Sequence, residues 1–138
     1  MHNPQDKSYW CKWGADMERR FVNDVAPYLN INAQINPEKR RNKYAPDLLV
    51  DGHLADLKYH ECPFFLSNAL YQVDNQYSVT FNCKDFERYA RLYPDLLIFM
   101  WLHFVDTEME VGGRRYRVRP LRGVWKAPFQ RVAELVSK

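Results

Sequence analysis

The spacing of apolar side chains predicts a helix near the start of the chain and a hairpin after it. Between residues 14 and 26, apolar side chains recur every three or four positions, which is the period of one helical face. Residues 45–50 and 54–60 are two apolar runs separated by Asp51-Gly52, a dipeptide typical of a two-residue hairpin turn. Such a turn pairs residue 50 with 53, 49 with 54 and 48 with 55.

The rest of the chain predicts a third strand, a helix, a buried strand and a second hairpin. Residues 77–81 alternate apolar and polar side chains, which is typical of a half-buried strand. Asn82 is a candidate N-cap for a helix that Pro94 would end. Residues 96–104 are apolar without alternation, which indicates a central strand covered on both faces. The last predicted elements are strands at 108–111 and 114–119 and a short helix at 128–136.

These elements predict an α/β domain with a mixed β-sheet flanked by helices. Their order over residues 14–104 is helix, three strands, helix, strand, followed by a C-terminal β-hairpin and helix. A chain of 138 residues is long enough for one domain with a substantial core, so we expect residues 1–138 to form a single domain. The content of 46% hydrophobic residues excludes a disordered chain.

Charge and cysteine content exclude several classes of protein. The net charge of +3 is too small to argue for nucleic-acid binding by itself. Cys11, Cys62 and Cys83 have no CxxC spacing, which argues against a structural zinc site and fits a reducing, cytoplasmic setting. The N-terminus lacks the apolar core of a signal peptide. The longest apolar run, residues 96–102, is too short to span a membrane, so we expect no membrane partner.

The predicted hairpin brings two carboxylates and a lysine to one place. Extending its register puts Asp47 opposite Asp56, with both side chains on the same face. Like charges directly opposite each other destabilise a hairpin, so this pair favours a cation between them. Lys58 lies two residues beyond Asp56 and therefore shares its face. Such a group is suited to hold Mg²⁺ beside a phosphate.

The segments Pro46-Asp47 and Asp56-Leu57-Lys58 resemble the signature of the PD-(D/E)XK nuclease superfamily. The predicted order of elements also resembles the αβββαβ core of these restriction-endonuclease-like proteins. The resemblance implies a Mg²⁺-dependent nuclease, endo- or exonucleolytic, in which Mn²⁺ can substitute. It implies that Asp47, Asp56, Glu18 of the first helix and the backbone carbonyl of Leu57 hold the metal. It also implies that Lys58 positions the attacking water, which makes Asp47, Asp56, Lys58 and Glu18 the expected catalytic residues.

Each candidate residue also has a structural interpretation. Glu18 lies on an apolar helical face and could pair with a nearby arginine rather than a metal. The two aspartates and Lys58 could be exposed strand residues, and a turn at Gly52-His53 would move Asp47 away from Asp56. Asp51 is a rival carboxylate, although its place in the turn is sufficient to explain it.

Basic residues gather in two segments that we expect to contact nucleic acid. One is the loop at residues 36–44, and the other is the strand at 114–119, where alternate arginines share one face. A row of cations suits a sugar-phosphate backbone, whereas the alternative for the strand is a charged edge that resists aggregation. The expected nucleic-acid-binding residues are Lys39, Arg40, Arg41, Lys43, Arg115, Arg117 and Arg119.

DNA is the expected substrate, although the sequence does not distinguish DNA from RNA or single strands from duplexes. No base-reading helix is evident, so we expect structure-dependent or weakly specific cleavage. A homodimer is plausible, because cutting both strands takes two sites. Two alternatives remain open: a non-catalytic nucleic-acid-binding module on the same fold, and a protein-binding adaptor or inhibitor of a nucleic-acid enzyme.

Overall fold

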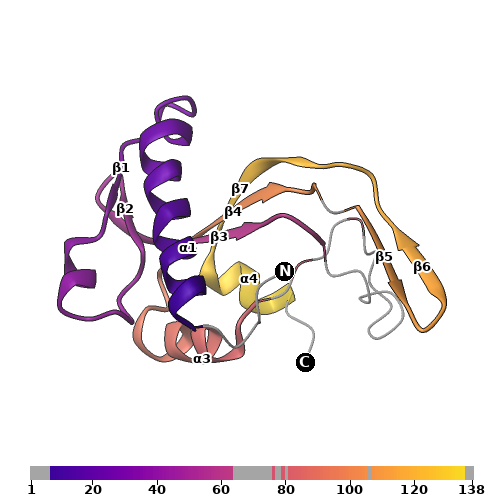
Figure 1. Cartoon of the computed structure of the whole chain (residues 1–138). Helices are drawn as coiled ribbons and strands as arrows, with labels where there is room; N and C mark the ends of the chain where they lie inside the picture. The colour runs from indigo at the N-terminus through magenta and orange to yellow at the C-terminus, as the bar shows by residue number, and fades with distance from the viewer. Residues whose placement is uncertain (1–6, 64–75, 77–78, 80, 106, 136–138) are drawn as a thin grey trace. The chain divides into compact units, whose positions relative to one another are not determined.

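The chain folds into the α/β class that the sequence predicts. The computed structural model describes residues 7–63, 76, 79, 81–105 and 107–135 (Figure 1). Its N-terminal elements are α1 (Lys7–Arg20), the π-helix η1 (Phe21–Val25), β1 (Ala33–Ile35), the 3₁₀-helix η2 (Pro37–Arg40), β2 (Leu48–Val50) and β3 (His53–His60). Its C-terminal elements are α3 (Cys83–Leu92), β4 (Leu97–His103), β5 (Glu108–Val111), β6 (Arg114–Arg117), β7 (Arg122–Pro128) and α4 (Phe129–Leu135).

Five of the strands form one mixed sheet in the order β1-β2-β3-β4-β7, and β5 pairs with β6 in a separate two-stranded sheet. The chain divides into two compact units, Met1–Leu57 and Lys58–Lys138. The boundary between the units falls inside β3, so one continuous strand belongs to both.

The first helix begins earlier than its apolar pattern predicts. It starts at Lys7 rather than near residue 14, because Gly14 does not interrupt it although glycine is a weak helix former. The predicted face is confirmed, since Phe21 is fully buried and Glu18 is buried beside it. The helix ends close to Pro27, as predicted, where the N–H of Ala26 donates to the carbonyl of Phe21.

The first hairpin has the predicted turn and the predicted register. Leu48 pairs with Ala55, Leu49 with Leu54, and Val50 with His53. Asp51 and Gly52 have φ angles of 49° and 82°, the left-handed conformation that a type I′ turn requires at both central positions. The strands themselves are Leu48–Val50 and His53–His60, so the first is shorter than predicted.

Two strands were not predicted, and one predicted strand is not observed among the described residues. β1 pairs antiparallel with β2, and three residues are too few to show a period. The basic loop at 36–44 contains η2. Val79 and Phe81 belong to no strand, and residues 77, 78 and 80 lie outside the described residues. From α1 to β4 the order is still helix, three strands, helix, strand, but with β1 as the first strand.

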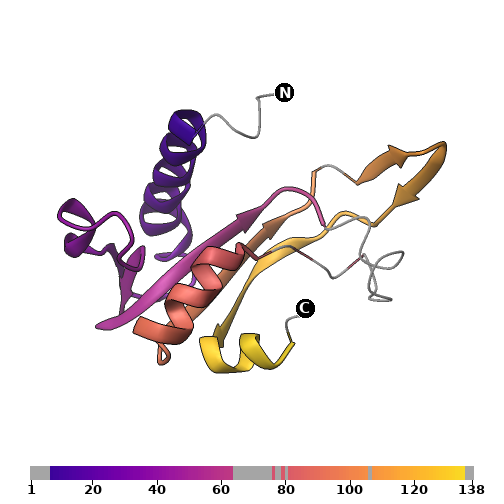
Figure 2. The same ribbon diagram turned by 90° about the horizontal axis from the view of Figure 1, so that it is seen from below.

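The second unit is built on α3, α4 and the pair β4–β7. Asn82 caps α3 as predicted, because its side chain accepts hydrogen bonds from the N–H groups of Lys84 and Asp85. β4 lies between β3 and β7 in the sheet, so its predicted central position is confirmed, and β7 pairs along its whole length. Figures 1 and 2 show α3 and α4 on the same face of β4 and β7. The buried cluster between them comprises Tyr89, Leu96, Ile98 and Phe129.

The C-terminal hairpin and helix are confirmed, but β6 ends at Arg117 and not at residue 119 as predicted. Gly112 and Gly113 form the turn between β5 and β6 with positive φ angles of 59° and 80°. α4 lies within one residue of the predicted helix at either end. No helix among the described residues is both long and apolar enough to cross a bilayer.

Candidate functional site

Asp47 directly precedes β2 and uses both carboxylate oxygens. Its Oδ1 accepts a hydrogen bond from Lys39 Nζ at 2.7 Å, and its Oδ2 accepts one from the backbone N–H of Leu57 at 3.1 Å. The side chain therefore joins η2 to β3. Its backbone carbonyl accepts from Asn36, which fixes the chain where it enters the hairpin.

Asp56 and Leu57 lie on β3 beside Asp47. The hairpin register, extended by one residue, places Asp56 opposite Asp47. Asp56 is only 1% exposed, so its side chain is almost completely buried. Burying an ionised carboxylate is costly unless a cation or hydrogen-bond donors accompany it. In an antiparallel ladder the N–H and C=O of one residue point to the same side of the strand. The N–H of Leu57 donates to Asp47, so the carbonyl of Leu57 points toward the side of β3 on which Asp47 lies.

Glu18 completes a cluster that three different elements supply. Glu18 Oε1 lies 2.6 Å from Lys39 Nζ, so α1 and the segment before β2 each contribute a carboxylate to one ammonium. The alternative interpretation of Glu18 was that it pairs with a nearby arginine. Glu18 does have a cationic partner, but the partner is Lys39.

The placement of Lys39 follows from Asn36. The side chain of Asn36 caps η2 by accepting from the N–H of Glu38, and its amide donates to the carbonyl of Pro46 at 2.9 Å. Asn36 is 3% exposed, so these bonds hold η2 against the Pro46-Asp47 segment. Lys39, in the last turn of η2, is thereby directed at the carboxylates.

The electrostatic environment keeps Lys39 charged. Burial lowers the pKa of Lys39, but attraction to Asp47 and Glu18 and hydrogen bonds to both outweigh this, and the pKa lies above its ordinary value. Lys39 was expected to contact nucleic acid. The structure places its ammonium on the carboxylate pair instead.

The oxygen donors near Lys39 are of the type that a hard divalent cation prefers, but in the described residues they do not form a metal-binding group. Within the described ranges, no three or more His, Cys, Asp or Glu side chains are grouped closely enough to hold a metal ion. Two carboxylates do converge on one point, and the ammonium of Lys39 is the cation found there. Carboxylates and a backbone carbonyl are the ligands that Mg²⁺ prefers, so Glu18, Asp47, Asp56 and the Leu57 carbonyl are chemically suited to it.

Lys58 begins the second unit and is held by α3. Its Nζ lies 2.8 Å from Asp85 Oδ2, and the other oxygen of Asp85 pairs with Arg88 at 2.8 Å. The rings of Phe81 and Tyr89 lie 4.9 Å and 5.7 Å from the same ammonium. The side chain is 16% exposed, so Lys58 is not a freely solvated strand lysine.

The interaction of Lys58 with Asp85 was missed from the sequence. In the sequence, Asp85 is only an acidic residue in the first turn of the helix that Asn82 caps. Such a residue shows no sequence signal for a partner 27 positions earlier.

His60, at the end of β3, is a buried histidine that is neutral at neutral pH. Burial, and then the charge of Lys58, lower the pKa of His60 from 6.5 to about 4. Its Nε2 atom is buried and has no hydrogen-bond partner within the described part of the chain.

We expect the stability of the protein to fall between pH 6.5 and pH 4 partly because of His60. In this range the unfolded chain binds a proton at this residue and the native protein does not, so acidification favours unfolding. The two pKa values correspond to at most about 3 kcal/mol. Urea unfolding at several pH values should show a smaller loss on acidification for His60→Gln than for the wild type. His53→Gln, at the exposed other end of β3, is the control. If His60→Gln loses as much stability on acidification as the wild type, then His60 does not contribute to the pH dependence of stability.

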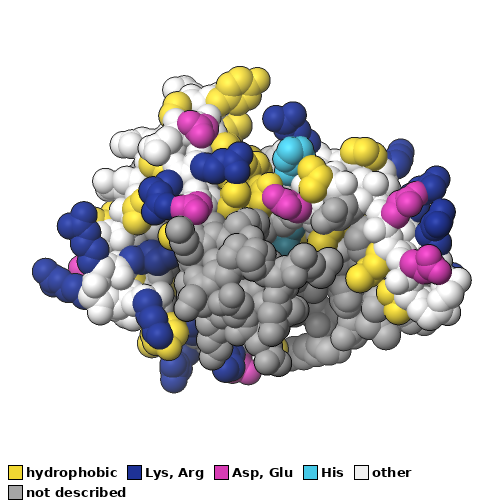
Figure 3. Space-filling model, in the orientation of Figure 1, with side chains coloured by type: hydrophobic (Ala, Val, Ile, Leu, Met, Phe, Trp, Pro, Cys, Tyr) yellow, Lys and Arg dark blue, Asp and Glu magenta, His cyan; other side chains and the backbone are white. Residues whose placement is uncertain are grey.

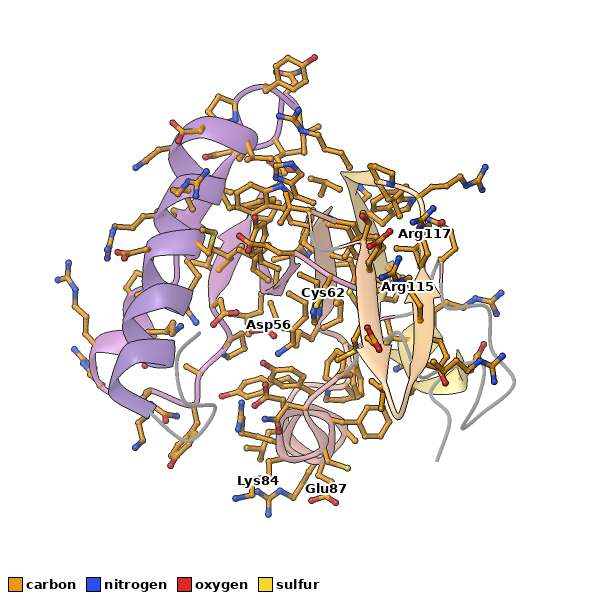
Figure 4. All side chains as sticks on the ribbon, turned by 45° about the vertical axis from the view of Figure 1, so that its right-hand side comes forward. Asp56, Cys62, Lys84, Glu87, Arg115 and Arg117 are labelled. Atoms are coloured by element: carbon orange, nitrogen blue, oxygen red, sulfur yellow. The ribbon has the colours of Figure 1, made fainter. Side chains whose placement is uncertain are left out.

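The basic strand is less positive than its sequence alone suggests. In β5–β6 Arg117 pairs with Glu108 and Arg115 with Glu110, and the side chains of Arg117 and Glu108 form an ion pair. Figure 3 shows carboxylates among the basic side chains at the edge where this hairpin lies, and Figure 4 shows Arg115 and Arg117 on β6. The Gly112-Gly113 turn already implied these cross-strand pairs.

The remaining predicted phosphate contacts, which include Arg119, are all exposed. Arg119 exchanges backbone hydrogen bonds with the side chain of Gln76 at 2.6 Å and 2.9 Å. Arg40, Arg41 and Lys43 are exposed. Among the predicted cations, these three are the ones closest along the chain to Lys39 and its carboxylate partners.

No protein-family model, curated protein or solved structure matches this chain.

Proposed function

We propose that the chain is a Mg²⁺-dependent nuclease of restriction-endonuclease-like fold that hydrolyses phosphodiester bonds, with DNA as its substrate. The observation that carries the proposal is the register of the first hairpin. This register brings Asp47 against the Asp56-Leu57 segment of β3, and Glu18 converges with Asp47 on one cation. Ordinary solvent-exposed strand residues do not need two carboxylates that converge on one cation at the start of a hairpin.

Glu18, Asp47, Asp56 and the carbonyl of Leu57 would hold the metal. The hydrogen bond from Leu57 N–H to Asp47 fixes both the carboxylate and the peptide beside it. When bound, Mg²⁺ polarises the scissile phosphate and makes hydroxide available near neutral pH.

Lys58 orients the attacking water and offsets charge that develops on the phosphate. Asp56 and Lys58 are two residues apart on the uninterrupted strand β3, so the pleat directs both side chains to one face. Asp85 restricts the ammonium of Lys58 to one position, which reduces the entropy lost when it meets the reacting group.

The exposed cations beside η2 provide the grip on the nucleic acid. Arg40, Arg41 and Lys43 follow Lys39 directly, so phosphates bound there lie next to the carboxylate cluster. Backbone contacts of this kind carry no sequence information, which supports cleavage with weak sequence preference. Arg115 and Arg117 contribute less, because glutamates face them across the hairpin.

A specific observation favours a second candidate, a non-catalytic nucleic-acid-binding module. Lys39 already pairs with both Glu18 and Asp47, so each carboxylate has a cationic partner without a metal ion. A domain that had lost its metal would need such an internal cation.

A cleavage assay with labelled DNAs separates these candidates. The panel comprises single-stranded, duplex, flap and four-way-junction substrates, each with Mg²⁺ or with EDTA. We expect cutting in Mg²⁺, none in EDTA, and a rate at least about 100-fold lower for Asp56→Asn, because the isosteric amide removes the charge that holds the metal. Asp24→Asn, on the exposed side of η1, should cut like the wild type.

The other outcomes are equally informative. Salt-sensitive DNA binding without cleavage in any metal would favour the binding module. If the protein neither binds nor cuts DNA, both candidates are overturned and the protein-binding adaptor is left. Cutting at a single defined sequence would contradict the weak specificity proposed for the substrate.

A further inference from the structure

The ammonium of Lys39 occupies the point where Glu18 and Asp47 converge. Lys39 Nζ lies 2.6 Å from Glu18 Oε1 and 2.7 Å from Asp47 Oδ1. The three side chains are 25%, 11% and 19% exposed, respectively, so this is a largely desolvated triad rather than a surface ion pair. Charges in such a setting are screened less by water and salt than charges on the surface.

A divalent ion cannot enter this position while Lys39 remains. Mg²⁺ binds oxygen at about 2.0–2.1 Å, and an ammonium in contact with the same oxygens would lie within a few ångströms of it. Two cations that close repel each other strongly in a partly buried site. Asp47 Oδ2 accepts the N–H of Leu57, and Oδ1 accepts Lys39 Nζ, so a metal bound at Oδ1 competes directly with Lys39.

Lys39 has the chemistry of a cation that can leave. Its charge is carried on a flexible four-carbon stem and is strongly hydrated in water, unlike the planar fork of arginine. It lies in the last turn of η2, next to the exposed residues Arg40 and Arg41. An extended Lys39 would therefore join the exposed basic segment.

We propose that Lys39 is an internal counter-ion that competes with the divalent metal for Glu18 and Asp47 and so sets the metal affinity of this site. The inference rests on the proposed nuclease function and specifies its regulation. Without metal, Lys39 stabilises the carboxylates; with metal, it is displaced. The protein therefore has a weaker metal site and a more stable metal-free state than the carboxylates alone would give.

Metal titration by calorimetry, without nucleic acid, tests the inference. The probes are Mn²⁺ and Ca²⁺, and the proteins are the wild type, Lys39→Met and the control Lys43→Met. Both variants lose one positive charge, but Lys43 is exposed and its ammonium lies over the ring of Tyr44, 5.1 Å from its centre. We expect Lys39→Met to bind both ions at least about tenfold more tightly than the wild type, because the competitor is gone. The metal affinity of Lys43→Met should differ from that of the wild type by less than about twofold.

Thermal unfolding gives a second readout. Lys39→Met should have a lower Tm than the wild type in EDTA, and saturating Mn²⁺ should raise its Tm more than that of the wild type. If Lys39→Met does not fold in EDTA, Lys39→Gln, which keeps a hydrogen-bond donor without the charge, should show the same gain in affinity.

Equal or weaker metal affinity in the Lys39 variants overturns the inference. If the wild type nevertheless cuts DNA in Mg²⁺, only the role of Lys39 is wrong and the proposed function stands. If no variant binds Mn²⁺ and the wild type does not cut, the proposed function falls together with the inference.

Discussion

Lys58→Met is expected to lower the rate of DNA cleavage at least about 100-fold while the protein stays folded. In the proposed mechanism, the loss in rate follows from removing the cation that would orient the water and offset the charge of the transition state. The fold should tolerate the change because Asp85 keeps its second partner, Arg88, at 2.8 Å. The Asp85 carboxylate is therefore not left buried without a cation, which is the usual cause of severe destabilisation in such variants.

Single-turnover cleavage in Mg²⁺, with substrate affinity measured in Ca²⁺, separates chemistry from binding. Lys84→Met is the matched control, because Lys84 is exposed on α3 and points away from the fold in Figure 4. Its cleavage rate should equal that of the wild type. If Lys58→Met also cuts at the wild-type rate, then the contact with Asp85 is purely structural and Lys58 has no part in catalysis.

The elements that the sequence predicted correctly depend on local chemistry. The dipeptide Asp51-Gly52 specifies a type I′ turn because both residues tolerate positive φ, and that turn alone determines which residues of the hairpin face each other. Asn82 marks the start of α3 because its side chain can satisfy free N–H groups of the first turn. The position of Asp47 opposite Asp56 follows from the turn and not from the sheet around it.

The elements that were missed depend on partners far away in the chain. β1 is a strand only because β2 offers it hydrogen bonds, and β7 only because β4 does. Neither segment had a pattern strong enough to predict without its partner. The early start of α1 has a local cause, because Gly14 is tolerated inside the helix although glycine is a weak helix former.

Lys39 shows the same limit at the candidate site. In the sequence it is one of several basic residues between 39 and 43, and nothing local distinguishes it from Arg40 or Arg41. Its partners are 21 and 8 positions away, and they are brought together by the cap that Asn36 forms on η2. A run of like charges predicts a basic surface, but not which member of the run turns inward.

Asp47→Asn is expected to abolish cleavage and also to destabilise the protein by about 1–3 kcal/mol. The carboxylate accepts from two donors, Lys39 Nζ on one oxygen and Leu57 N–H on the other. An asparagine has one oxygen and one NH₂ group, so in either orientation its NH₂ group faces a donor. The isosteric change thus keeps the shape of the residue and removes one hydrogen bond as well as the charge.

Asp51→Asn provides the matched control for this prediction. The same substitution four residues away keeps the oxygen that accepts from the N–H of Asn32, and asparagine is favoured in a left-handed turn position. Urea unfolding and cleavage should therefore be unchanged for Asp51→Asn and both impaired for Asp47→Asn. If Asp47→Asn is destabilised but still cuts DNA in Mg²⁺, then the cluster with Lys39 is structural and the metal is held elsewhere. If it is neither destabilised nor slower, then the contacts of Asp47 with Lys39 and Leu57 contribute nothing, and both the counter-ion and the metal site fail together.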